Sequence, residues 1–189
     1  FVSIVAVLWK FAQKNSNLGD VDLSASVKSD GGKNIATKNT QVSNHTVTTV
    51  LVFIHADNNT STLDSVKWLC LDQSAGKGCI VNLPLDMATT LNGAQTTLAD
   101  VFSKQQSKCS IKAVSSATGV QISHVMVVDS KGWEKVLGLS SVGATQLTRQ
   151  APELLSLLHT DMSAPQLLNL AEAAHSIGRK NLNKLDAPC

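Results

Sequence analysis

Three aspartates of this 189-residue chain stand beside apolar, β-branched runs of strand length. Asp57 follows the run "VTTVLVFIHA", Asp86 follows "GCIVNLPL", and Asp64 precedes "SVKWLCL". The strand in "GCIVNLPL" is expected to end at its proline, so Asp86 would lie in the following loop, at the end of the sheet. Such carboxylates belong either to a chemical site or to turns and helix caps, and Asp86, with two threonines soon after it, suits both interpretations.

The other residues that could do chemistry are poorly arranged for it. His55 and His124 are interpreted as half-buried strand residues rather than ligands, because no Cys or His lies at the spacing of a metal site. The chain has no Gly-x-Ser-x-Gly, no P-loop and no Gly-x-Gly-x-x-Gly. The sequence therefore gives no support for nucleophilic catalysis or for a dinucleotide site.

Composition narrows the functional classes further. With 189 residues and 43% hydrophobic composition, the chain is long enough for one domain with a proper core. The net charge is only +2, aromatic residues make up 4% of the chain, and Tyr is absent. Without a basic surface or aromatic stacking platforms, a nucleic-acid partner is not expected.

The N-terminal region differs from the rest of the chain. Residues 1–14 are apolar as far as Trp9 and then turn basic and polar at Lys10. This run is shorter than the roughly 20 residues that span a bilayer, so it is interpreted either as the outer end of a membrane anchor or as an N-terminal core element. Residues 15–46 are expected to form an exposed leader, and residues 47–189 a folded domain.

Strand and helix patterns alternate from Val47 onward. Strands are predicted near Val50, Trp68, Ile80 and Val127, the middle two joined by the short turn "QSAGKG". Helical spacing follows in "TTLADVFSKQQSKCSIKAVSSATG", expected to hold two helices, in "KGWEKVLGL", and in a C-terminal pair divided at Pro165. This alternation predicts an α/β fold, namely a three-layer α/β/α sandwich with a central mixed sheet.

The four cysteines bear on the compartment. Counting inward from the "QSAGKG" turn places Cys70 opposite Cys79, as a cross-strand disulfide requires, although two free core thiols are the alternative. Cys109 and Cys189 could form a second bridge, but sequence does not fix connectivity. Four cysteines behind a membrane anchor favour an exported domain.

From about Val47 to Leu182, the order of elements and five short stretches resemble the extracytoplasmic domain of the LytR-CpsA-Psr family. "VLVFIHADNN" looks like the family's first strand, ending in Gly-x-Asp-x-Arg, and "LDSVKWLCLD" like its Arg-Ser-Asp-Thr strand. "VNLPLDMA" looks like the Ser-Ile-Pro-Arg-Asp strand end, and "ATGVQISHVMVVDSKGWEKVLGL" like the Gly-Ile-Pro-Ile-Asp-His-Tyr segment and its helix. "LTRQAPELLSLL" is similar to the Arg-Gln helix start.

Family proteins transfer glycopolymers from a polyprenyl-pyrophosphate carrier to peptidoglycan or a similar acceptor. The resemblance therefore implies cell-wall biogenesis outside the plasma membrane of a bacterium, with a polyprenyl-phosphate-type lipid bound in an apolar tunnel. It implies that Asp57 and Asp64 bind Mg²⁺, that Asp86 is the catalytic strand-end aspartate, and that Arg149 is catalytic and binds phosphate. Such a site suits phosphoryl transfer, which needs cations around the phosphates.

The basic half of that site is largely missing from this chain. Asn59, Thr62 and Leu85 stand where family members carry arginines, and the connection leading to Arg149 is short. Each positioned donor in such a site contributes about 2 to 4 kcal/mol, so catalysis is expected to be weak or absent. Two hypotheses follow: a membrane-anchored phosphotransferase of the cell envelope, and a lipid-binding or scaffolding relative that keeps the fold without the activity.

Overall fold

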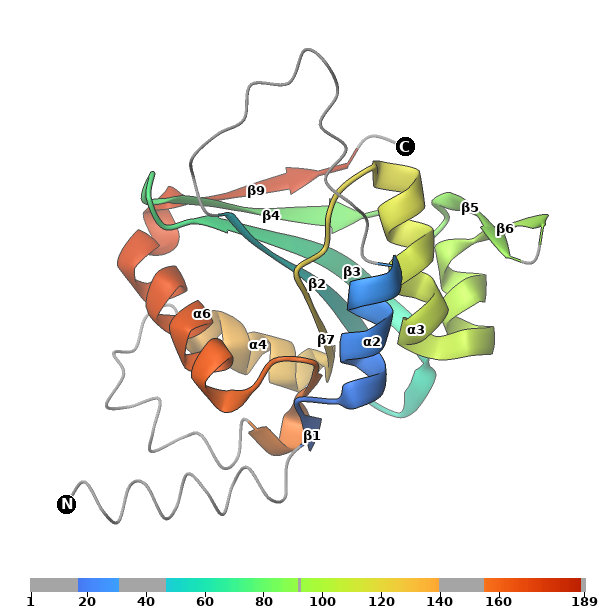
Figure 1. Ribbon diagram of the computed structural model, residues 1–189, viewed down its shortest axis with the longest axis horizontal. Coiled ribbons are helices and arrows are strands. Elements are labelled where there is room, and N and C mark those ends of the chain that lie inside the picture. Colours follow the sequence, from blue (N-terminus) through green and yellow to red (C-terminus); the bar gives the residue numbers. More distant parts are fainter. Residues whose placement is uncertain (1–16, 31–46, 92, 140–154, 188–189) are drawn as a thin grey trace.

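The computed structural model describes residues 17–30, 47–91, 93–139 and 155–187 (Figure 1). The principal helices are α2 (Val21–Asp30), α3 (Leu98–Thr118), α4 (Ser130–Leu139) and α6 (Ala164–Ile177), followed by a 3₁₀ turn, η1 (Arg179–Asn181). The strands are β1 (Asn17–Leu18), β2 (Val47–Ala56), β3 (Asn59–Asp72), β4 (Lys77–Leu83), β5 (Ala88–Leu91), β6 (Ala94–Thr97), β7 (His124–Asp129), β8 (His159–Thr160) and β9 (Leu182–Asp186).

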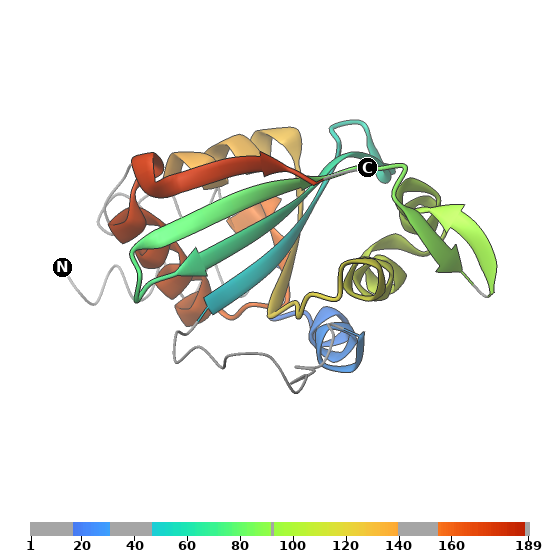
Figure 2. The same cartoon turned by 90° about the horizontal axis from the view of Figure 1, so that it is seen from above.

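Seven of these strands form one mixed sheet in the order β1-β8-β7-β2-β3-β4-β9. The central strand β2 pairs parallel with β7 and antiparallel with β3, and β4 pairs antiparallel with β3 and parallel with β9. Helices α4 and α6 cover one face, and α2 and α3 cover the other (Figures 1 and 2). The predicted α/β/α sandwich with a central mixed sheet is therefore confirmed, including its four predicted strands.

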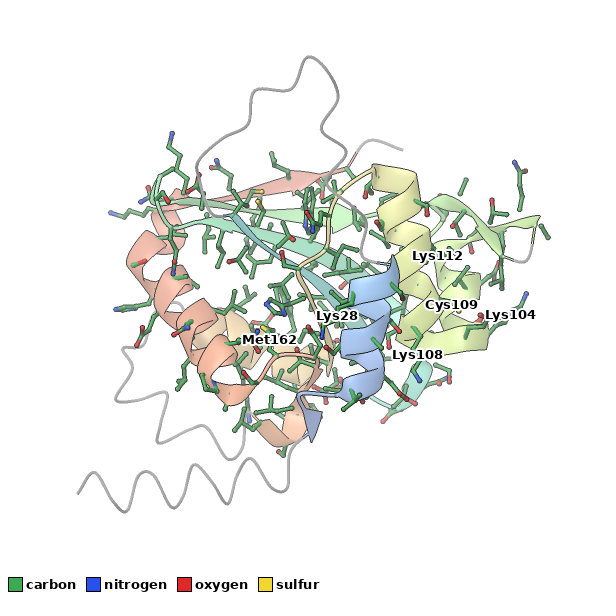
Figure 3. All side chains as sticks on the ribbon, in the orientation of Figure 1. Lys28, Lys104, Lys108, Cys109, Lys112 and Met162 are labelled. Atoms are coloured by element: carbon green, nitrogen blue, oxygen red, sulfur yellow. The ribbon has the colours of Figure 1, made fainter. Side chains whose placement is uncertain are left out.

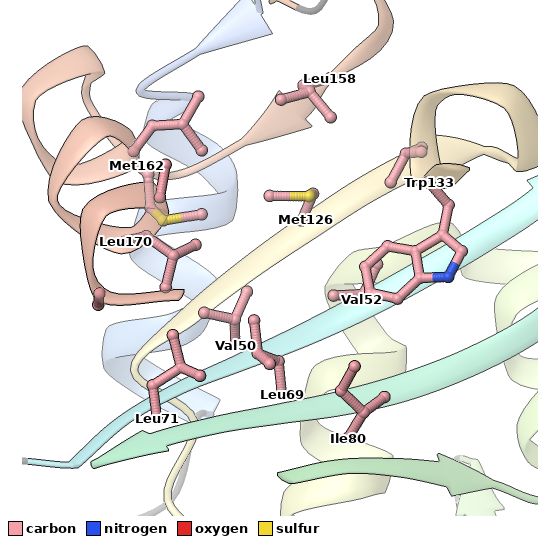
Figure 4. Close-up of a cluster of buried hydrophobic side chains, with 14 of the residues drawn as sticks. Val50, Val52, Leu69, Leu71, Ile80, Met126, Trp133, Leu158, Met162 and Leu170 are labelled. Atoms are coloured by element: carbon pink, nitrogen blue, oxygen red, sulfur yellow. The ribbon is translucent and has the colours of Figure 1, made fainter. Parts of the chain in front are cut away.

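Two hydrophobic clusters lie on the two faces of the sheet. Between the sheet and α4 and α6, Trp133 packs over residues of β2, β3 and β4 such as Val52 and Ile80 (Figure 4). On the other face, Phe53 of β2 and Phe102 of α3 stack with ring centroids 5.3 Å apart. Because both faces are covered, β2 is a continuous apolar run and not an alternating one, and all its residues from Thr49 to Ile54 are buried.

The exposed leader expected over residues 15–46 does not hold for residues 17–30. There β1 pairs with β8, and α2 packs against α3 with Leu23 only 2% exposed. The Asp20 carboxylate caps this helix by accepting a hydrogen bond from the Leu23 N–H at 2.9 Å. The sequence of this helix is polar and rich in Ser, and few apolar residues form its buried side. The hydrophobic period that marks an amphipathic helix is therefore weak, and the helix was not predicted. Residues 1–14 lie outside the described part of the chain.

Two further elements differ from the sequence prediction. The region from Leu98 to Thr118 is one 21-residue helix, which ends at Gly119 with a left-handed φ of 67°. Before it, β5 and β6 form a two-stranded hairpin that the sequence analysis missed. The dipeptide Asn92-Gly93 was the available signal, since it is a strong marker of a two-residue hairpin turn.

The predicted Cys70–Cys79 disulfide is absent. The register does place Cys70 directly opposite Cys79, but both thiols are free. Opposed residues of antiparallel strands have Cβ atoms about 4.5 to 5.5 Å apart, whereas a disulfide needs about 3.8 Å. Burial, followed by the neighbouring Cys79, raises the pKa of the Cys70 thiol to about 11, which keeps it protonated at neutral pH. Cys189 lies outside the described residues.

Asp20 should contribute to stability in a pH-dependent way. Partial burial opposes its ionisation, but the hydrogen bond from Leu23 and the contact between Asp20 Oδ2 and His159 Nε2 (2.5 Å) outweigh burial, so the pKa of Asp20 lies below its ordinary value. A carboxyl group with a depressed pKa stabilises the fold above its unfolded pKa of about 3.9, and this contribution is lost as pH falls through the folded value.

We therefore expect Asp20→Ala to lower the free energy of unfolding by about 1 to 2 kcal/mol at pH 7. The loss should begin to shrink below about pH 4 and disappear at a lower pH, once the wild-type carboxyl is protonated in the folded protein as well. Urea unfolding at several pH values measures both effects. Asp22→Ala is the matched control, because Asp22 forms only an exposed pair with Lys108 and should change stability little. An equal loss in the two variants would contradict the role given to Asp20.

Candidate functional site

Three parallel strands bring their carboxyl ends to the same edge of the sheet. These are β2, β7 and β4, and β3 begins at the same edge because it runs antiparallel to β2 and β4. Asp57 follows β2, Asp129 ends β7, and Asp86 lies in the turn after β4. The crevice outside the carboxyl ends of strands is the usual ligand site in α/β sheets. The predicted site aspartates thus lie along one edge.

The pairing of β2 with β3 is irregular beside Asp64, near this edge of the sheet. Ile54 pairs with Ser65 and His55 pairs with Leu63, so Asp64 is the extra residue of a β-bulge. A bulge of this kind re-aims a side chain next to a functional site. The Asp64 carboxylate accepts a hydrogen bond from the Ser130 hydroxyl at 3.2 Å, at the first residue of α4.

Asp57 approaches the same turn of helix as Asp64. Its carboxylate forms an ion pair with Lys131 Nζ at 3.5 Å. The partners of the two aspartates, Ser130 and Lys131, are consecutive residues, so both carboxylates lie beside the start of α4. Carboxylate oxygens suit Mg²⁺, which usually takes one or two carboxylates and fills its other positions with water or substrate phosphates. Asp57 and Asp64 therefore fit the implied metal as a partial ligand set.

Asp86 does not complete a protein-only metal site. Within the described residues, no three His, Cys, Asp or Glu side chains lie close enough to hold a metal ion together. His55 and His124 lie half-buried in strands, as predicted, and His124 Nδ1 contacts Asp161 at 2.9 Å. Asp86 itself is exposed in a turn whose backbone closes from Met87 N–H to Pro84 C=O. Arg149 lies outside the described residues.

Leu85, which occupies a family arginine position, has a structural role here. Its side chain packs against the hydrophobic cluster around α3, and its carbonyl accepts a hydrogen bond from Ala99 N–H at 3.0 Å. An arginine at this position would place a guanidinium against that cluster. Leu85 therefore attaches the turn after β4 to α3.

A cleft of about 400 Å³ opens on the α4 face of the sheet, lined in part by Ser130, the hydrogen-bond partner of Asp64. Ser130 and Glu134 of α4 form its rim, and Lys67 of β3 and Lys184 of β9 contribute positive charge. Lys67 Nζ donates a hydrogen bond to Asn82 Oδ1 at 2.7 Å. Burial, and next the nearby charge of Lys184, hold the pKa of Lys67 below its ordinary value. A half-buried cation with an adjacent like charge is placed to receive an anion.

An apolar cavity adjoins this cleft. Its free volume is about 50 Å³, between the sheet and helices α4 and α6. Ile80, Trp133 and Leu137 line both spaces, and the Trp133 ring lies across the sheet strands in Figure 4. The polar cleft and the apolar cavity thus share walls, which is the order of surfaces that an amphiphilic ligand with an anionic head requires.

The sequence analysis missed Lys67, Lys184 and Ser130. Lysines on strands carry no motif, and β9, which brings Lys184 to the cleft, begins at Leu182, where the predicted helical tail ended, and was not predicted as a strand. Ser130 lies in the stretch "VVDSKG", where a strand passes directly into a helix. That transition was predicted, and it is the one signal that marked this residue.

No profile of a known protein family and no curated protein matches the chain. Its structure, however, is similar to those of several solved proteins. The transcriptional regulator yvhJ from Bacillus subtilis matches with a TM-score of 0.59 and 14% identity over 75% of this chain and 82% of that one. B. subtilis TagV matches with a TM-score of 0.57 and 12% identity over 75% of this chain and 84% of that one, and TagT bound to LI-WTA with 0.58 and 8% over 79% and 82%.

The chain therefore has the fold of LytR-CpsA-Psr proteins, as the sequence resemblance implied. Within the described residues, the longest apolar helix falls short of what crossing a membrane requires.

The pKa of Lys67 offers a direct test of the cleft's electrostatics. Lys184→Ala removes a neighbouring positive charge, so we expect the pKa of Lys67 to rise toward the ordinary lysine value of about 10.4. The titration can be followed by NMR of the lysine Cε and Nζ. Lys104→Ala, on the far face of the sheet, is the control and should leave Lys67 unchanged. No change with Lys184→Ala would show that the two side chains do not share the cleft.

Proposed function

We propose that this protein binds a polyprenyl-phosphate-type lipid in cell-wall assembly, outside the bacterial plasma membrane, and cleaves polyprenyl-pyrophosphate slowly or not at all. The observation that carries the proposal is the polar cleft that contains Lys67 and Lys184 and shares its walls with an apolar cavity. The fold shared with TagV and with TagT, which has been solved bound to LI-WTA, supports the same pathway and a glycopolymer or peptidoglycan partner.

The phosphate head would lie in the cleft. Lys67 and Lys184 supply charge-assisted hydrogen bonds to its oxygens, each stronger than a neutral hydrogen bond. Ser130, which lines the cleft, donates its single hydroxyl hydrogen to Asp64, and would have to give up this hydrogen bond to donate to the phosphate. Mg²⁺, held by Asp57 and Asp64, supplies positive charge to the phosphate oxygens when it is bound.

The prenyl chain would enter the cavity under α4 and α6. Burying it is favourable by roughly 25 cal/mol for each Å² of apolar surface removed from water. The present space of about 50 Å³ holds only the first carbons of such a chain, so a longer ligand must separate α6 from α4. The hydrophobic side chains between the sheet and these helices are mostly aliphatic, together with Trp133.

We expect weak catalysis because the positions that the sequence resemblance matches to arginines carry uncharged residues in this chain. A leaving phosphate develops negative charge that positioned donors must stabilise, and each donor contributes about 2 to 4 kcal/mol. Leu85 packs into the α3 cluster, and Asn59 and Thr62 are exposed polar residues without charge. Lysines in the cleft bind as point charges and do not reproduce the bidentate geometry of arginine.

Lipid binding tests the proposal directly. We expect a fluorescent polyprenyl phosphate to bind the wild-type protein, and the double variant K67M/K184M to bind about tenfold or more weakly, because methionine keeps the apolar stem and removes the charge. Ala174→Leu should also weaken binding by filling the cavity. Ser176→Leu, at an exposed position of the same helix, is the matched control. Wild-type protein that binds no lipid would overturn the proposal.

Catalysis is tested separately, by Mg²⁺-dependent phosphate release from polyprenyl-pyrophosphate. We expect turnover orders of magnitude below that of arginine-bearing proteins of the same fold. Any residual activity should fall in Asp64→Asn, which keeps the size of the side chain and removes its charge. Turnover equal to that of those proteins would show that other cations supply the missing charge.

The alternative function is a non-catalytic scaffold or interaction domain in cell-wall assembly. It is favoured by Leu85, whose packing turns a family site position into a structural contact. A scaffold would bind neither the lipid nor the pyrophosphate, while the fold and its stability would be unaffected by K67M/K184M. The lipid-binding measurement therefore separates the two functions.

A further inference from the structure

Lys67 of β3 belongs to a row of polar side chains that crosses three neighbouring strands. The register places Lys67 opposite Asn82 of β4, and Asn82 beside Asp186 of β9. Lys67 Nζ donates a hydrogen bond to Asn82 Oδ1 at 2.7 Å, and Asn82 Nδ2 donates one to Asp186 Oδ1 at 2.6 Å. Among the described residues, the hydrogen-bond partner of Lys67 is therefore a neutral amide, and the carboxylate lies one strand further along the row.

The surroundings of Lys67 differ from those of lysines on the covering helices. Lys67 is half-buried in the cleft, whereas Lys28 of α2 and Lys104 of α3 are exposed, on the opposite face of the sheet (Figure 3). Burial, followed by the charge of Lys184, lowers the pKa of Lys67, and the Asp186 carboxylate opposes this shift. A lowered pKa leaves a larger fraction of the amine uncharged at neutral pH, and only the uncharged amine has a lone pair that can bond to carbon.

The cleft beside this amine is large enough for a small organic molecule. Its volume of about 400 Å³ lies within the range of ligand pockets. Ile80 and Trp133 give it apolar walls, which suit a carbon skeleton or a ring. Its positive charge includes Lys184 on the β9 side, and Glu134 lies on the α4 side, so an anionic group of a ligand is favoured next to Lys184.

We propose that Lys67 is a reactive amine that forms an imine with a small aldehyde, and that this aldehyde carries a phosphate group held by Lys184. Uncharged Nζ adds to the carbonyl carbon, which forms a C–N bond, and one Nζ hydrogen passes to the carbonyl oxygen. The resulting carbinolamine loses its hydroxyl group and the second Nζ hydrogen as water, which leaves a C=N bond. The step needs no oxidant or further reactant, and water reverses it.

This reactivity uses the cleft for which we propose lipid binding, but it does not rest on lipid binding. A bound anion near Lys67 favours the charged form of the amine, so a lipid phosphate in the cleft would keep Lys67 unreactive. An aldehyde bonded to Lys67 would in turn occupy the space of the lipid phosphate. The two ligands would therefore compete for one cleft, and each can be measured in the absence of the other.

The test is borohydride trapping of the imine with pyridoxal phosphate as the probe, at neutral pH, followed by peptide mapping. Borohydride reduces the imine to a stable secondary amine, so the mass of each lysine-containing peptide reports the reaction of that lysine. We expect Lys67 to be labelled about tenfold faster than Lys104 and Lys112, two exposed lysines in the same sample. Pyridoxal without the phosphate should label Lys67 more slowly, because Lys184 then has no anion to hold.

Two charge variants with opposite expected effects test the reactivity of the amine itself, with pyridoxal as the probe. K184M removes a positive charge, so the pKa of Lys67 should rise and the pH of half-maximal labelling should move up. D186N removes a negative charge but keeps an oxygen for the hydrogen bond from Asn82, so that pH should move down. K77M, at an exposed lysine of β4, is the control and should change neither rate nor pH dependence.

Two results would overturn the proposal. Labelling of Lys67 no faster than that of Lys104 and Lys112 would show that Lys67 reacts as an ordinary solvated lysine. Slower labelling of Lys67 in both K184M and D186N would show that the variants disturb the cleft, because the effect would then not depend on the sign of the charge removed. Neither result bears on lipid binding, which is measured without an aldehyde.

Discussion

The parallel pairing of β2 with β7 is the constraint on which the rest of the structure depends. It places the carboxyl ends of both strands at one edge, so that Asp57 and the start of α4 meet there. Because β2 is buried on both faces, it must be covered by two layers of helices. The cleft with Lys67 and Lys184, for which we propose lipid binding, lies on the face covered by α4 and α6.

The charge in the cleft is partly buried. Lys67 is half-buried and its charge is opposed by burial and by Lys184, so a bound anion would relieve an existing electrostatic cost. This arrangement suits one phosphate held in a fixed place.

Leu85 connects a turn at the edge of the sheet to one of the covering helices. The turn after β4 must be attached to α3, and Leu85 does this through its packing and through the hydrogen bond from Ala99 to its carbonyl. The aspartates at the sheet edge are retained in position, yet Asp86 stands apart from the pair near α4.

The sequence by itself determined the α/β/α layers, the four central strands and the aspartates at their ends. These features depend on the spacing of apolar residues along the chain and on the Pro and Gly residues that end strands and helices. It could not reveal that Lys67 and Lys184, 117 positions apart by their numbers, line one cleft. Nor could it show that α2 belongs to the domain, since its one deeply buried apolar residue, Leu23, gives little period. Those features depend on which strands become neighbours, and long-range pairing is decided only when the whole core packs.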